Sequence, residues 1–165
     1  MKRFLLVLTI TVSVLACAAQ KDSLPPYQRF PELPAFTLLL SDSTTKYTKA
    51  DLPKNKPVLL FVFSPECSHC QQEAKEMVEN KALLKNIHVV MATFYPFPQM
   101  NEFAEKYRLA EIPNLVIGKD IFFTLPGFYD IRNLPFHALY SKKGKLIKAM
   151  EGSAGLTEMV KLLEE

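Results

Sequence analysis

Cysteine is scarce in this sequence, tryptophan is absent, and lysine and arginine do not cluster. Three cysteines in 165 residues exclude the scattered disulfide framework that holds small secreted domains together. The net charge is +3, and Lys2 and Arg3 account for two of these charges in a segment that we expect to be removed. Without a basic patch, the sequence gives no basis for nucleic-acid binding.

The remaining composition is that of one folded domain. Hydrophobic residues make up 48% of the chain and charged residues 22%, which is enough apolar material for a core and too little charge for a disordered chain. No internal repeat or low-complexity run divides the sequence.

The N-terminus has the pattern of an export signal. Lys2 and Arg3 precede an apolar stretch over residues 4–16, which is shorter than the roughly 20 residues of a membrane-spanning helix. The run Val-Leu-Ala-Cys at 14–17 resembles a bacterial lipobox, which implies that Cys17 becomes the lipidated first residue. Ordinary cleavage, for instance after Ala19, and a buried N-terminal helix are the alternatives.

A proline-rich stretch follows the signal. Residues 17–34 include four prolines and few apolar residues in any period, so we expect a flexible tether there and a folded domain over 35–165. Together with residues 1–16 as the signal peptide, this organisation predicts an exported protein of the cell envelope. It would be held on a membrane by its lipid and face the oxidising periplasm.

Strand and helix patterns alternate along the domain. An N-terminal hairpin (35–40 with 44–47) is followed by a buried strand at 57–63 with no polar residue, which is typical of a central strand covered on both faces. The further strands are expected at 87–94, 114–117, 136–140 and 145–150, and the helices at about 67–85, 98–108, 120–130 (broken) and 156–163. This order predicts an α/β fold with a mixed sheet and helices on both faces.

The sequence Cys67-Ser68-His69-Cys70 lies between the buried strand and the following helix. The thiolate is the reactive form of cysteine, and a helix N-terminus stabilises it through free N–H groups and a partial positive charge. Cys70 lies one helical turn beyond Cys67 and can close a disulfide with it. We therefore expect Cys67 to attack substrates and Cys70 to resolve the mixed disulfide.

The same spacing has two other possible uses. A cysteine pair can form half of a zinc site, but only His69, His88 and His137 are available as histidine ligands and there is no second cysteine pair. A purely structural disulfide would close a loop too short to stabilise the fold much. A redox-active disulfide, with no metal and no other cofactor, is the favoured interpretation.

Two separated segments resemble the thioredoxin superfamily, most closely its exported TlpA/ResA-like branch. In residues 59–73, the family pattern Cys-x-x-Cys-x-x-Glu is matched by Cys67, Cys70 and Glu73. Residues 129–146 resemble the family's cis-proline strand and the hairpin after it. The resemblance implies that the Leu134–Pro135 bond is cis, that Pro135 faces the cysteines, and that this loop offers backbone groups to substrates.

Pro113, in the run Ile112-Pro113-Asn114, also resembles a cis-proline stretch. Pro135 is favoured because a hairpin and one helix follow it directly, as the fold requires, whereas about fifty residues follow Pro113. The extra strand and helix before Pro135 are a feature of the same branch.

The chain departs from the family next to the cysteines. Glu66 stands where the family often has tryptophan, and it would oppose thiolate formation if it pointed inward. Phe61 occupies the place of the buried aspartate of thioredoxins. Glu73 is the expected substitute that helps to deprotonate Cys70, the alternative being a solvated helix carboxylate.

The three histidines are expected to have different roles. A protonated His69 would stabilise the Cys67 thiolate, the alternative being an exposed and inert imidazole. His88 and His137 are expected to be strand residues at the edge of the core.

The leading function is disulfide exchange with exported proteins by a monomer that also meets an upstream redox partner. The first alternative is a thiol peroxidase of the redoxin type, although Ser64 and Leu60 stand where that group has threonine and proline. The second is a non-catalytic module that binds a metal, as a copper chaperone does, or a partner protein.

Overall fold

The computed structural model describes residues 24–165. The predicted signal peptide (1–16) and the lipidation site Cys17 lie outside the described residues. Within residues 24–165 the helices are all too short or too polar to span a bilayer.

The centre of the molecule is a mixed sheet with the strand order β2-β1-β5-β4-β3-β6-β7. The strands are β1 (Thr37–Leu39), β2 (Lys46–Thr48), β3 (Val58–Val62), β4 (His88–Thr93), β5 (Leu115–Asp120), β6 (Phe136–Tyr140) and β7 (Leu146–Glu151). Strands β3, β4 and β5 run parallel, and β6 is antiparallel to β3. The predicted entry hairpin is formed by β1 and β2.

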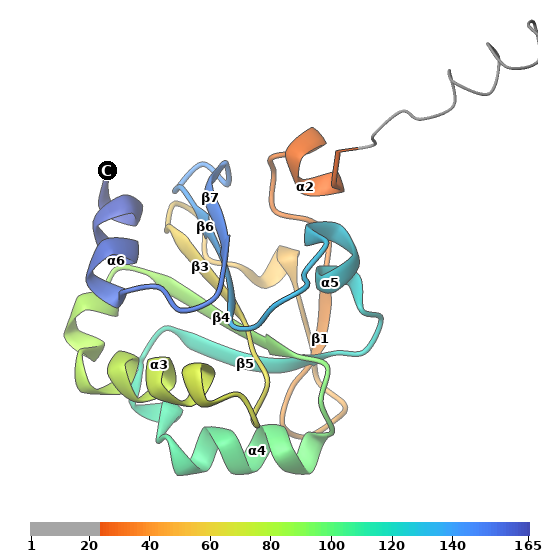
Figure 1. Ribbon diagram of the computed structural model, residues 1–165, viewed down its shortest axis with the longest axis vertical. Helices are drawn as coiled ribbons and strands as arrows, with labels where there is room; N and C mark the ends of the chain where they lie inside the picture. The colour runs from red at the N-terminus through yellow and green to blue at the C-terminus, as the bar shows by residue number, and fades with distance from the viewer. Residues whose placement is uncertain (1–23) are drawn as a thin grey trace, which may run out of the picture.

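Helices cover both faces of this sheet (Figure 1). The helices are α2 (Pro26–Arg29), α3 (Ser68–Glu79), α4 (Phe97–Lys106), α5 (Thr124–Tyr129) and α6 (Leu156–Glu164), with 3₁₀ turns at Lys49–Asp51, Lys81–Leu84 and Leu109–Glu111. The connections β3–α3–β4 and β4–α4–β5 each join two parallel strands, and both move across the sheet in the same direction. Because such connections are right-handed, α3 and α4 lie on the same face of the sheet. Helix α6 joins them there, whereas α5 and α2 lie on the other face.

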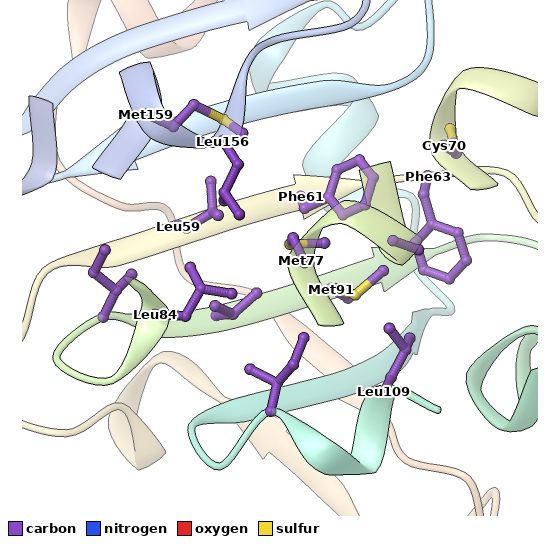
Figure 2. Close-up of a cluster of buried hydrophobic side chains, with 14 of the residues drawn as sticks. Leu59, Phe61, Phe63, Cys70, Met77, Leu84, Met91, Leu109, Leu156 and Met159 are labelled. Carbon is purple, nitrogen blue, oxygen red and sulfur yellow. The ribbon is translucent and has the colours of Figure 1, made fainter. Parts of the chain in front are cut away.

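Strand β3 is buried along its whole length and divides the core into two layers. Leu59, Phe61 and Phe63 pack under α3, α4 and α6, while Leu60 and Val62 pack toward α5. Figure 2 shows the first layer, in which Cys70 and Phe63 lie at one end of the cluster and Leu84 at the other. The run at 57–63 is apolar throughout because β3 is covered on both faces. The predicted α/β architecture is confirmed.

Two predicted helices end or begin elsewhere. Helix α3 stops at Glu79, and a separate 3₁₀ turn carries the chain to Leu84. The broken helix expected over 120–130 is wrong at its start, because Asp120 is the last residue of β5. The buried carboxylate of Asp120 accepts hydrogen bonds from the N–H groups of Thr124 and Leu125 at 3.2 and 2.8 Å. Helix α5 therefore begins at Thr124.

The folded part of the chain starts before the predicted boundary at residue 35. Helix α2 packs against α5, with the rings of Tyr27 and Tyr129 at 5.8 Å. Leu33 is buried, and Glu32 forms an ion pair with Lys145 at 2.6 Å. These residues form no periodic pattern in the sequence, which is why they resembled a tether.

Gly118 of β5 lies too close to β1 to carry a side chain. A Cβ atom there would lie 2.7 Å from Cβ of Leu38 and 3.0 Å from the carbonyl oxygen of Leu39. Gly118→Ala is therefore expected to lower the free energy of unfolding by about 1–3 kcal/mol, measured by urea denaturation. Gly127→Ala is the control because it points into open space in α5; an equal loss in both variants would contradict the close approach.

Candidate active site

Cys67 is the residue at which loop and helix meet. Its backbone is extended and it forms the N-cap of α3, where its Sγ accepts the N–H of Cys70 at 3.4 Å. The side chain is partly exposed. A sulfur that caps a helix receives both a backbone hydrogen bond and the partial positive charge of the helix end, and both stabilise a thiolate.

Cys70 occupies the opposite environment. It is fully buried one turn further along α3, and both cysteines are free thiols. Burial, followed by the hydrogen bond with Cys67 and the nearby charges of Cys67 and Glu73, raises the pKa of Cys70 far above that of an ordinary thiol. A substrate therefore reaches Cys67 first, and Cys70 needs to lose a proton before it can react.

The start of β6 faces this pair. The Leu134–Pro135 peptide bond is cis, as the resemblance implies. The Cys67 thiol donates to the Leu134 carbonyl oxygen at 3.6 Å. Within residues 24–165 the cis peptide bond is Leu134–Pro135, and the bond before Pro113 is trans. Pro135, and not Pro113, therefore lies opposite the cysteines.

Residues of β7 hold the loop that carries Leu134. The Glu151 carboxylate accepts the Arg132 N–H at 2.7 Å and the Asn133 side-chain amide at 2.8 Å. The Gly152 N–H donates to the Pro135 carbonyl oxygen at 2.7 Å. Glu151 and Gly152 thus hold the backbone opposite Cys67 by three hydrogen bonds.

Glu73 is buried, so the alternative of a solvated helix carboxylate is wrong. It projects from the same face of α3 as Cys70 and is 6% exposed. Its Oε1 accepts the Ala154 N–H at 2.9 Å, and its Oε2 lies 2.7 Å from Nε2 of His137. The carboxylate thus has a partner for each oxygen and lies one turn beyond Cys70.

His137 is a site residue that the sequence interpretation missed. It is a strand residue of β6, as expected, but it is 1% exposed and bonded to Glu73. Its ring stacks on that of Phe61, with centroids 5.0 Å apart and planes 3° from parallel. The pattern contained a clue, because His137 alternates with Leu139 on the buried face, and a buried polar side chain there needs a partner.

His69 and Glu66 lie on the surface next to the cysteines. Because Glu66 is exposed, its charge is solvated and does not point into the thiol site. It borders a groove of about 260 Å³ beside Cys67. The groove is lined by Pro65, Glu66, Gln71, Gln99, Glu102, Phe103, Lys106 and Tyr107.

The described part of the chain brings no metal-binding group together. Within residues 24–165, no three side chains of histidine, cysteine, aspartate or glutamate are arranged to hold an ion. His69 is exposed, His88 is hydrogen-bonded to Tyr47, and His137 is hydrogen-bonded to Glu73.

Comparisons with known proteins agree with this geometry. A family model described as a thioredoxin-like domain matches residues 47–165. A secreted disulfide oxidoreductase of Mycobacterium tuberculosis, homologous to E. coli DsbE, has a similar structure (TM-score 0.65, 20% identity, 78% of this chain and 94% of that one). No curated protein sequence matches.

Two further solved structures share the fold. DsbF of M. tuberculosis superposes with a TM-score of 0.66 at 20% identity, over 78% of this chain and 92% of that one. A peroxiredoxin-like protein of Aquifex aeolicus does so with 0.65 at 14% identity, over 81% and 84%.

Proposed function

Because the chain belongs to the thioredoxin-like domain family, we propose that it is a thiol–disulfide oxidoreductase in which Cys67 and Cys70 exchange disulfides with exported protein substrates. The observation that carries this proposal is the contrast between the two thiols. Cys67 is partly exposed at a helix N-terminus, and Cys70 is buried one turn away with its N–H on the Cys67 sulfur.

The reaction runs in two exchanges. The Cys67 thiolate attacks a substrate disulfide, the substrate S–S bond breaks, and one substrate sulfur leaves as a thiolate that takes up a proton. Cys70 then loses its proton and attacks the Cys67 sulfur, which releases the second substrate thiol. Two electrons have passed to the substrate, and the protein holds a Cys67–Cys70 disulfide. The reverse sequence oxidises a substrate dithiol.

The surrounding residues serve these two steps. Leu134 and Pro135 present a fixed backbone edge along which a substrate chain lies next to Cys67. Glu73 accepts the proton of Cys70, and His69, when protonated, adds a positive charge beside the Cys67 thiolate. The redox-active disulfide is the only prosthetic element that this chemistry uses.

Residues 1–16 act as the signal peptide and Cys17 as the lipidated residue, so the protein is anchored in the cell envelope and faces the periplasm. It acts there as a monomer. The secreted M. tuberculosis relative of the same fold supports export. An upstream redox partner resets the Cys67–Cys70 pair after each turnover.

The proposal is tested by equilibrating the purified protein with glutathione or dithiothreitol redox buffers. We expect two thiols to be lost on oxidation and a reduction potential between about −270 and −120 mV. A pair that does not equilibrate would overturn the proposal, and oxidation by peroxide that outpaces disulfide exchange would favour the peroxidase alternative.

A further inference from the structure

We propose that His137 is a positioning residue of the resolving step: it shares a proton with Glu73 and enables the pair to take up the proton that Cys70 gives up. This inference rests on the proposed disulfide exchange. It concerns a buried contact between α3 and β6 across 64 positions of sequence.

The hydrogen bonds of Glu73 indicate which atoms of the Glu73–His137 pair carry protons. An ionised carboxylate accepts hydrogen bonds at both oxygens. Here Oε1 accepts the N–H of Ala154, and Oε2 accepts the Nε2–H of His137. This tautomer leaves a lone pair on Nδ1. That atom is buried and has no hydrogen-bond partner among residues 24–165.

An unsatisfied buried acceptor is unfavourable, so its presence in a folded protein calls for an explanation. A proton on Nδ1 would convert the pair to an imidazolium and a carboxylate 2.7 Å apart, which is a favourable contact for both groups. The pair therefore has a site for one additional proton. The stacked ring of Phe61 at 5.0 Å keeps the imidazole in place.

The pair is close enough to act on Cys70. Cys70 and Glu73 both lie on the buried face of α3, three residues apart. Residues at this spacing are neighbours on a helix surface. The charge of Glu73 is one of the causes that raise the pKa of Cys70, so its field reaches the sulfur. Because burial keeps Cys70 protonated, a base next to it accelerates the step in which it becomes a nucleophile.

Few other ionisable groups face the pair. On α3 these are Cys70 and, beyond it, Cys67. The neighbouring strands contribute Phe61 from β3 and Met150 from β7, which are both paired with His137 in the sheet. The segment before α6 contributes the backbone amide of Ala154, so the thiols are the ionisable side chains from which the pair can take up a proton.

The step balances as follows. The Cys70 S–H bond breaks, its proton passes to the Glu73–His137 pair, and its electron pair forms a bond to the Cys67 sulfur. The bond between Cys67 and the substrate sulfur breaks, and the substrate leaves as a thiolate that is protonated by solvent. The pair then returns its proton to solvent.

The test isolates the attack of Cys70. Reduced protein is mixed with 5,5′-dithiobis-(2-nitrobenzoate) in a stopped-flow instrument at pH 5 to 9. The first thionitrobenzoate released reports reaction of Cys67 and depends on reagent concentration, whereas the second reports attack by Cys70 and does not. The variant is His137→Gln, which can still donate to Glu73 but takes up no proton. His88→Gln is the control, since His88 pairs with Val58 at the other end of β3.

In the wild type, the rate at which the second thionitrobenzoate is released is expected to change little with pH once the Glu73–His137 pair has lost its additional proton. In His137→Gln it should be about 10-fold to 100-fold slower at pH 7 and rise with pH until it approaches the wild-type rate at pH 9, where hydroxide removes the Cys70 proton. His88→Gln should follow the wild type. A His137→Gln profile that is parallel to the wild type at every pH would reduce His137 to a structural role and overturn the inference.

Failure of the proposed function looks different, because the wild-type protein itself would then release one thionitrobenzoate and not two. If His137→Gln does not fold, ¹⁵N NMR of histidine-labelled wild-type protein decides the matter. The protonation curve of His137 is expected to shift between the dithiol and disulfide forms. An identical curve in both forms would overturn the inference.

Discussion

Replacing Cys67 with serine is expected to abolish disulfide exchange, and replacing Cys70 with serine is expected to trap the protein on its substrate. A serine hydroxyl cannot act as the sulfur nucleophile, so Cys67→Ser should reduce a protein disulfide no faster than buffer does. Cys70→Ser retains the partly exposed Cys67, which still attacks but has no thiol to release the mixed disulfide.

Both results are read on non-reducing gels after incubation with a disulfide-containing protein. Cys70→Ser should give a covalent adduct of the summed mass that dithiothreitol removes, and the double cysteine variant should give none. Ser68→Ala is the matched control because Ser68 is exposed between the two cysteines, and its activity should equal that of the wild type. Retained activity in Cys67→Ser would contradict the assignment of the nucleophile.

Removing the Glu73 side chain is expected to have the largest effect on stability. Glu73→Ala would leave the buried Nε2–H of His137 and the N–H of Ala154 without their acceptor. Breaking a buried, hydrogen-bonded pair in this way costs about 3 kcal/mol. The loss should appear as a lower urea midpoint with an unchanged slope.

Glu79 provides the comparison within the same helix. Its carboxylate is 61% exposed and paired with Lys75 at 3.7 Å, and exposed pairs of this kind contribute about 0.5 kcal/mol or less. Glu79→Ala should therefore leave the urea midpoint nearly unchanged. Equal losses in the two variants would contradict the assignment of the effect to the buried pair.

The contacts of Glu73 show that the site contains a buried acid although position 61 is phenylalanine. Phe61 is fully buried and lies directly across from His137 in the β3–β6 ladder. The acid of this site comes from α3, and the strand opposite supplies a histidine instead of a second acid. The buried charge has thus moved from the sheet to the helix while staying next to Cys70.

The site illustrates how contacts distant in sequence adjust a local motif. Cys67, Cys70 and the helix N-terminus are neighbours in the chain, so their geometry follows from the four-residue motif alone. The carbonyl of Leu134, 67 positions away, reaches Cys67 only because β6 pairs with β3. The orientation of that loop depends in turn on Glu151 of β7.

The sequence by itself determined the order of strands and helices, the central position of β3, and the position of the two cysteines at the start of α3. These features depend on periodicity, on burial of an uninterrupted apolar run and on one helical turn of spacing, which are all local properties of the chain. It did not reveal the packing of residues 26–34, since isolated apolar side chains form no period.

Only the tertiary structure decided that Glu73 is buried and that His137 is its partner. Whether a helix carboxylate meets solvent or a buried imidazole depends on which strand pairs with which and in what register, and a shift of one residue would turn His137 to the other face. The β3–β6 register sets Phe61 against His137, and α3 lies over that row with Glu73 pointing toward it. The cysteine pair was therefore encoded locally, and the Glu73–His137 pair was encoded by the packing of helix on sheet.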